Sequence, residues 1–213
     1  MLNLTLIDAD SIYFRQACVT KNKKDLRTGI DHVMNQIKRD CLSDQLMVAV
    51  KGHGNFRKDL FPKYKANRKP QPDDMKEALT YAHDYMCKKW DAVMADGMEA
   101  DDLVAIWAYE AREAETAYVI AGIDKDLLQI PGHHYNFVKR MHSDVDDDQA
   151  HLSLMLQCLK VRATFRSSSI SLRLALYLGN RSLRKFPCPF TATNTKHTPV
   201  SYTHLTLPTN REV

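Results

Sequence analysis

Short apolar runs that alternate with segments of helical periodicity constrain the fold of this chain most. The runs from Asn3 to Ile7, Met47 to Val50, Ala92 to Met94 and Ala117 to Ile123 are predicted to be strands. Strands that are apolar along their length and alternate with helices are typical of a parallel sheet covered on both faces. The sequence therefore predicts an α/β fold, a three-layer sandwich with a central, mainly parallel sheet.

The layers over this sheet are predicted from the spacing of apolar residues. They recur every three or four residues from Ile12 to Cys18 and from Ile30 to Leu42, as in amphipathic helices. The pair Asp73-Asp74 can cap a helix from Met75 to about Lys89. A further helix is expected from Ala100 to Ala114.

Composition narrows the class of protein. The chain has 213 residues and 44% hydrophobic content, which is enough for one domain with an appendage. No apolar run is long enough to cross a bilayer and the first residues lack a signal-peptide pattern, so we expect a cytoplasmic protein without a membrane partner. The five cysteines form no CxxC pair, which predicts reduced thiols. His133-His134 lacks a neighbouring ligand at helical spacing, and a solvated loop is expected there.

Acidic residues gather where the predicted strands end. In a parallel sheet the ligand site lies outside the carboxyl ends of the strands, so these carboxylates are expected on one rim. They would repel one another unless a divalent cation bound there, and oxygen ligands without Cys or His select Mg²⁺ or Mn²⁺. The chemistry that this implies is metal-assisted attack on a phosphodiester. The candidate catalytic and metal-binding residues are Asp8, Glu99, Asp101, Asp102, Asp124 and Asp126.

Each acidic segment taken alone has an ordinary explanation. Asp101 and Asp102 could simply complement a helix dipole, and Asp124 with Asp126 could belong to a plain loop. Their combination with Asp8 at another strand end favours a shared site. The run from Asp144 to Asp148 lacks such a context and is predicted to be a solvated loop.

Basic and aromatic residues are concentrated in one short stretch after the second predicted strand. On a helix, Tyr64 and Arg68, or Lys65 and Lys69, would lie one turn apart on one face. Such a face suits phosphates together with a stacked base, although a merely solvated basic face is the alternative. The candidate nucleic-acid-binding residues are Arg57, Lys58, Tyr64, Lys65, Arg68 and Lys69.

These motifs together resemble those of the phage and bacterial 5′→3′ exonucleases, relatives of flap endonucleases with a PIN-like (resolvase-like) nuclease domain. The resemblance is carried by Ile7–Asp10, Asn55–Arg57, Tyr64–Arg68, Glu99–Asp102 and Asp124–Leu127. It implies a PIN-like domain over residues 1–160, with two Mg²⁺ or Mn²⁺ ions held by the six acids. It also implies a gateway helix that includes Tyr64, Lys65 and Arg68. The implied substrate is DNA with 5′ ends or flaps, or RNA in an RNA/DNA hybrid, and a monomer is expected.

Two departures from the family pattern stand out. Lys51–Gly54 replace a segment in which many relatives carry another Asp, and after Lys160 the family's Gly-Asp segment and its helical duplex-binding hairpin are missing. From Val161 onward the only acid is Glu212, and Val200–Thr209 resembles a translated sequencing adapter. Residues 161–213 are therefore expected to be a frameshifted tail without a domain.

Two alternatives to the nuclease remain open. The missing acid lends weight to a non-catalytic nucleic-acid-binding PIN-like protein. A PIN-type ribonuclease is the other alternative, and the Tyr64–Arg68 segment disfavours it because ordinary PIN ribonucleases lack such a gateway.

Overall fold

The computed structural model describes residues 3–20, 22–66 and 68–163. They form a six-stranded sheet of order β3-β2-β1-β4-β5-β6, in which every neighbouring pair is parallel except the antiparallel β5 and β6. This confirms the mainly parallel sheet. The strands are β1 (Leu4–Asp8), β2 (Gln45–Lys51), β3 (Val93–Ala95), β4 (Tyr118–Ala121), β5 (Gly132–Asn136) and β6 (Met141–Val145).

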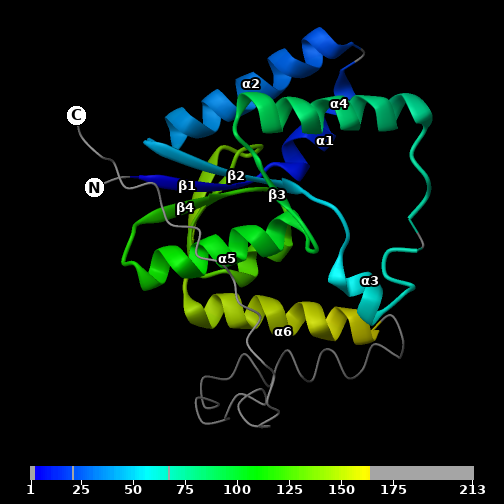
Figure 1. Ribbon diagram of the computed structural model, residues 1–213. Coiled ribbons are helices and arrows are strands. Elements are labelled where there is room, and N and C mark those ends of the chain that lie inside the picture. Colours follow the sequence, from blue (N-terminus) through cyan, green and yellow to red (C-terminus); the bar gives the residue numbers. More distant parts are fainter. Residues whose placement is uncertain (1–2, 21, 67, 164–213) are drawn as a thin grey trace. The chain divides into compact units, whose positions relative to one another are not determined.

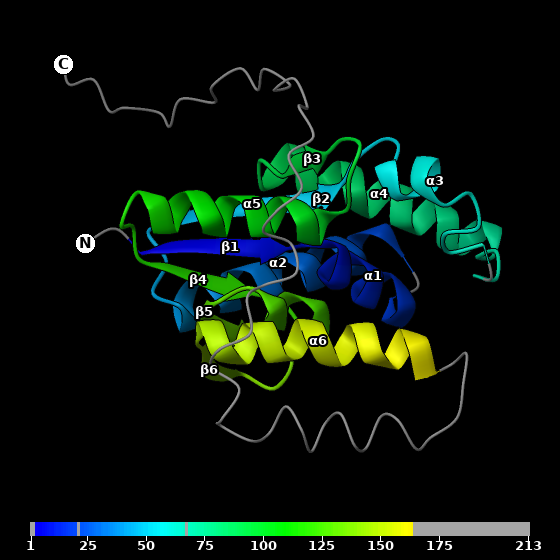
Figure 2. The ribbon, with the colours of Figure 1, turned by 90° about the horizontal axis from the view of Figure 1, so that it is seen from below.

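Helices cover both faces of the sheet, which confirms the three layers (Figure 1). On one face lie α1 (Asp10–Val19), α2 (Lys23–Asp40) and α4 (Asp73–Lys89). On the other face lie α5 (Ala100–Glu113) and α6 (Asp147–Ala163), which are both in front of the sheet in Figure 2. A short 3-10 helix, η1 (Lys125–Gln129), follows β4 and packs against α6.

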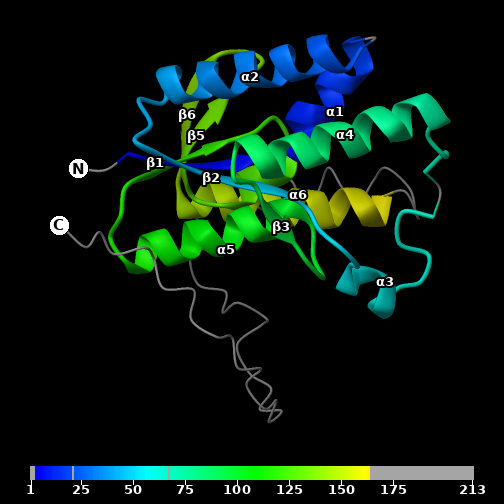
Figure 3. The same cartoon turned by 45° about the horizontal axis from the view of Figure 1, so that its top comes forward.

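The connection from β2 to α4 carries a short helix, α3 (Phe56–Leu60), which lies beyond the carboxyl end of β2 and apart from α1, α2 and α4 (Figure 3). The predicted basic and aromatic stretch, from Asn55 to Lys69, begins with this helix. Its position places the cationic side chains near the edge of the sheet where the parallel strands end.

Two apolar cores explain why the inner strands are apolar along their length. Ile7 packs with Ile30 and Met34 of the α1, α2 and α4 layer. Its neighbour Leu6 points to the other face and packs with Trp107 of α5. Because successive side chains of a strand alternate between faces, a sheet buried on both sides needs apolar residues at every position.

Three helices begin earlier than predicted, and α1 starts at Asp10 instead of Ile12. Helix α2 starts at Lys23, since the Asn22 side chain caps it by accepting a hydrogen bond from the Asp25 N–H at 2.9 Å. Helix α4 starts at Asp73, so Asp73 and Asp74 lie in its first turn and do not cap it. Acids in a first turn complement the positive end of the helix dipole, which accounts for their place inside the helix.

The two loop predictions in the second half of the domain are wrong. His133 and His134 belong to β5, and the His134 side chain is buried with its Nε2 bonded to the Ile130 carbonyl at 2.8 Å. Asp144 belongs to β6, and Asp147 lies in the first turn of α6, where Arg112 pairs with it. These strands are polar, so their pairing depends on neighbours rather than on an apolar pattern.

Helix α6 continues to Ala163, past the predicted domain boundary at Lys160. The remainder of the predicted tail lies outside the described residues. Within the part of the chain that the structure describes, no helix is long and apolar enough to cross a bilayer. Cys18, Cys41, Cys87 and Cys158 are free thiols.

Candidate active site

The parallel strands bring three acids to one edge of the sheet. Asp8 is the last residue of β1 and is only 6% exposed. Asp101 lies in the first turn of α5, which follows β3. Asp124 follows β4 and caps η1, where its Oδ1 accepts the Asp126 N–H at 3.0 Å. The sequence prediction of a common rim thus agrees with the placement of these three residues.

The electrostatics of Asp8 reflect this gathering of charge. Burial, together with the negative charges of Asp10, Asp101 and Asp124, raises the pKa of Asp8 to about 7 against one opposing hydrogen bond from the Asp10 N–H. Burial also raises the pKa of Asp101, with help from the charges of Asp102 and Glu99. Both carboxylates are therefore costly to keep ionised without a cation nearby.

Asp102 differs because a cation from the basic stretch already binds it. Arg57 contacts both carboxylate oxygens, with Nη2 at 2.7 Å from Oδ1, and the Glu99 N–H donates to Oδ2 at 3.0 Å. Burial acts to raise the pKa of Asp102, but the hydrogen bonds from Arg57 and the backbone hold it below its ordinary value. A bidentate Arg–carboxylate pair of this kind fixes both partners in orientation.

Glu99 is held by three side chains of the same stretch. Asn55 donates from Nδ2 to Oε1 at 3.1 Å, Tyr64 donates from its hydroxyl to Oε2 at 3.0 Å, and the Lys65 ammonium pairs with Oε1. Although burial acts to raise the pKa of Glu99, the bonds from Lys65 and Tyr64 keep it low. The basic stretch and the start of α5 are thus in direct contact.

The basic stretch is not the helix that the sequence predicts beyond Leu60. After α3 the chain forms turns from Pro62 to Ala66, and Lys65 has a positive φ of 55°. Tyr64 and Lys65 both reach Glu99, which neighbouring residues of a regular helix would do poorly because they point about 100° apart. The backbone bonds in this segment are those of turns, such as the Tyr64 N–H to the Phe61 carbonyl at 2.8 Å. The remaining candidates Lys58, Arg68 and Lys69 are exposed.

The acids at the rim suit a hard divalent cation by donor type. Among the described residues, no three His, Cys, Asp or Glu side chains converge closely enough to hold an ion in the arrangement seen. However, none of the ion pairs between described residues involves Asp8, Asp101 or Asp124. Carboxylate oxygens with uncompensated charge fit Mg²⁺ or Mn²⁺ better than zinc. Asp126 contributes its backbone to the Asp124 turn, and its side chain is exposed.

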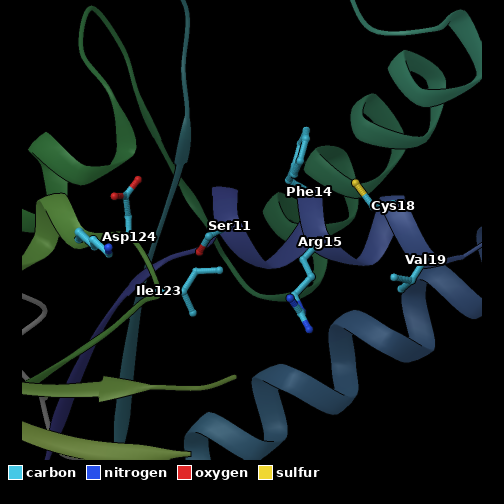
Figure 4. A pocket seen from close by; sticks show the side chains of 8 residues that line it. Ser11, Phe14, Arg15, Cys18, Val19, Ile123 and Asp124 are labelled. Atoms are coloured by element: carbon cyan, nitrogen blue, oxygen red, sulfur yellow. The ribbon is translucent and has the colours of Figure 1, made fainter. Parts of the chain in front are cut away.

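A pocket of about 610 Å³ opens beside Asp124, between α1 and the segment after β4 (Figure 4). Phe14 and Arg15 line it from α1, and Ile123 and Lys125 line it from the other side. It combines two cationic side chains with apolar surface. The sequence analysis missed Arg15 and Lys125, because an isolated basic residue on a helix gives no signal before the fold is known.

Asp10 is a third residue that the sequence analysis did not assign to the site. It stands two positions after Asp8, and its Oδ1 accepts hydrogen bonds from the Lys51 N–H at 2.8 Å and the Tyr13 hydroxyl at 2.9 Å. The Asp-x-Asp spacing was the available signal. Its charge acts on Asp8 more strongly than that of Asp101 or Asp124.

Comparison with known proteins defines the class to which this fold and site belong. Residues 3–156 match the family model described as 5′-3′ exonuclease, N-terminal resolvase-like domain. The chain therefore belongs to this family of nucleases, and the resemblance noted from its motifs is confirmed.

This chain matches only part of the length of each individual relative. The flap endonuclease Xni of Aliivibrio salmonicida is 29% identical over 140 residues, which is 61% of this chain and 53% of the relative. DNA polymerase I of Borreliella burgdorferi is 31% identical over 150 residues, which is 65% of this chain and 16% of the polymerase. The chain thus spans about half of the first relative and a small part of the second.

Solved structures support the fold. The bacteriophage T5 D15 protein co-crystallised with metal ions superposes with a TM-score of 0.56 and 18% identity, over 70% of this chain and 60% of that one. The T5 D15 flap endonuclease in a pseudo-enzyme–product complex with DNA and metal ions gives a TM-score of 0.53 and 16% identity, over 67% and 57% of the two chains. At such identities the likeness shows the resolvase-like fold alone.

Proposed function

We propose that this domain hydrolyses phosphodiesters of DNA at 5′ ends or flap junctions in a reaction that depends on divalent metal ions. One observation carries the proposal: the basic stretch touches the acidic rim, through Arg57 on Asp102 and Lys65 on Glu99, beside acids that form no ion pair with the described residues. A phosphate bound by the basic stretch would lie next to the carboxylates. Relatives named flap endonuclease and DNA polymerase I agree with this function.

The six acids predicted from the sequence are proposed to hold two Mg²⁺ or Mn²⁺ ions. Asp8, Asp101 and Asp124 are the central ligands, because the charges of Asp101 and Asp124 both act on Asp8 and no ion pair between described residues involves any of the three. Glu99, Asp102 and Asp126 would complete the set. Bound metal ions in such sites lower the pKa of a water and stabilise the leaving oxygen. The metal ions in the T5 D15 crystals support this choice of cofactor.

The basic stretch is proposed to bind the substrate backbone. Lys58, Arg68 and Lys69 are exposed and free to reach phosphates, whereas Tyr64 and Lys65 lie against Glu99 and would orient the strand at the rim. The pocket with Arg15 and Lys125 beside Asp124 offers a place for the adjoining nucleotides. DNA in the T5 D15 complex supports a DNA substrate. Action on RNA/DNA hybrids and a monomeric state belong to the same proposal.

Cleavage of 5′-labelled flap DNA with Mg²⁺ tests this function. Asp101→Asn removes one rim charge while keeping the shape of the side chain, so cleavage should fall by at least about a hundredfold while the protein stays folded. Asp74→Asn, which changes an exposed first-turn acid of α4, is the matched control and should cleave like the parent. If Asp101→Asn cleaved as fast as the parent, the site assignment would be wrong. A parent that bound flap DNA without cutting it would instead support the non-catalytic alternative.

A further inference from the structure

The hydrogen-bond ladder between β1 and β2 runs into a conflict at the rim. Asp8 pairs with Ala49, and the Ala9 N–H donates to the Ala49 carbonyl at 3.0 Å, so the parallel ladder continues one residue past the strand. In a parallel ladder the next donor would be the Lys51 N–H, directed at the Ala9 carbonyl. That carbonyl already accepts from the Ile12 and Tyr13 N–H groups, at 3.0 and 3.1 Å, as the first acceptor of α1.

Asp10 resolves this conflict with its side chain. Its Oδ1 accepts the Lys51 N–H at 2.8 Å in place of the occupied Ala9 carbonyl, and the same oxygen accepts the Tyr13 hydroxyl at 2.9 Å. The Asp10 N–H in turn donates to Oδ1 of Asp8 at 3.2 Å. One residue thereby ties the end of β2, the first turn of α1 and the Asp8 carboxylate together.

The helix α4 supports this arrangement from the other side. The His83 Nε2 is 2.8 Å from the Lys51 carbonyl, and the His83 ring stands edge-on to the Tyr13 ring with centroids 6.2 Å apart. Lys51 is therefore held through its N–H by Asp10 and through its carbonyl by His83. Asp8 ends the buried strand β1, and its carboxylate is in direct contact with the turn that follows through the Asp10 N–H.

We propose that Asp10 is a positioning residue that fixes the β1–α1 turn and thereby orients Asp8 at the metal site; this rests on the proposed function. Its role is to accept two hydrogen bonds on one oxygen. An asparagine has the same oxygen, so Asp10→Asn should keep the turn intact, whereas Asp10→Ala removes the acceptor. This separates positioning from a role of the Asp10 charge.

Two readouts test the proposal on the full chain. The first is amide hydrogen exchange of Lys51 without metal, which should quicken by about tenfold in Asp10→Ala and stay close to the parent in Asp10→Asn. The second is Mn²⁺ affinity, measured from the electron paramagnetic resonance signal of free Mn²⁺, which should fall about tenfold in Asp10→Ala and much less in Asp10→Asn. Asp74→Ala, which removes a first-turn acid from α4, controls for the loss of helix-dipole charge.

The two readouts can contradict the positioning role of Asp10 in two ways. Parent-like exchange and affinity in Asp10→Ala, or an Asp10→Asn variant as impaired as Asp10→Ala, would overturn the positioning role. The variant Asp8→Asn tests the proposed function separately from the positioning role of Asp10. It should lose Mn²⁺ binding even though Asp10 is unchanged. If Asp8→Asn bound Mn²⁺ like the parent, or if the parent bound no Mn²⁺, the proposed function would fail. In that case the hydrogen exchange of the Lys51 amide alone would decide whether Asp10 holds the turn.

Discussion

At the scale of single residues, the contacts of Lys65 give it two roles. It neutralises Glu99 in the free protein and is proposed to meet a phosphate in the complex. Lys65→Ala should therefore weaken DNA binding and reduce the slope of log K against log salt by about one. Titrations at several salt concentrations measure this, with Lys88→Ala, an exposed lysine at the end of α4, as the control. An unchanged slope in Lys65→Ala would instead favour the alternative that this stretch is a solvated basic face.

His134 gives the domain a stability that depends on pH. Burial lowers the pKa of His134, and the charge of His133 lowers it further. The hydrogen bond to the Ile130 carbonyl acts in the opposite direction but does not outweigh them. The unfolded chain therefore binds a proton at His134 near the ordinary pKa of about 6.5 while the folded protein does not, so the contribution of His134 to stability should fall as the pH drops below that value, whereas the raised pKa of Asp8 acts in the opposite direction. Urea unfolding at pH 7.5 and 5.5 tests this. His134→Gln should show a smaller loss between the two pH values, and an equal loss would contradict the assignment.

Residue types and spacing were sufficient to predict that Asp8, Asp101 and Asp124 lie on one rim, because each lies at or after the end of a strand that the apolar pattern marks. The contacts of Glu99 and Asp102 could not be found in this way. Their partners Arg57 and Lys65 come from a segment more than thirty residues earlier, and only the folded chain brings them together. The same holds for the link between Asp10 and Lys51.

At the scale of elements, the helix α3 anchors the basic stretch. Asn55 caps α3 by accepting the Arg57 N–H at 2.9 Å and also donates to Glu99. Asn55→Ala should cost about 1 kcal/mol of stability and weaken DNA binding as well, because the stretch is released from the rim. Asn22→Ala removes the cap of α2 at a similar cost and should leave DNA binding unchanged. Thermal unfolding and fluorescence anisotropy with labelled flap DNA measure the two effects, and equal DNA affinity in both variants would contradict the anchoring role.

The inner strands and long helices were predictable because their apolar periods are strong. The elements that the sequence analysis missed, β5 and β6, have polar sequences and form because β4 offers a free edge. After Leu60 the spacing of the basic and aromatic residues predicts a helix that the structure does not form. The chain forms turns there, and Tyr64 contacts Glu99.

At the scale of the whole molecule, the domain from β1 to α6 contains both apolar cores. We therefore expect a chain ending at Ala163, the last residue of α6, to unfold within about 4 °C of the full chain. Differential scanning calorimetry of both chains measures this. A larger drop would show that the predicted tail, which lies outside the described residues, packs on the domain and is genuine protein.

The central claim is that the rim acids bind divalent metal ions, and anomalous scattering from Mn²⁺ tests it most directly. Crystals of the full chain soaked in Mn²⁺ should show anomalous density beside Asp8, Asp101 and Asp124, because these acids share one edge and no cation of the described residues pairs with them. Density at this rim that disappears in Asp8→Asn would agree with the account. Mn²⁺ density confined to other places, such as the exposed His133 and His142 pair, would contradict it.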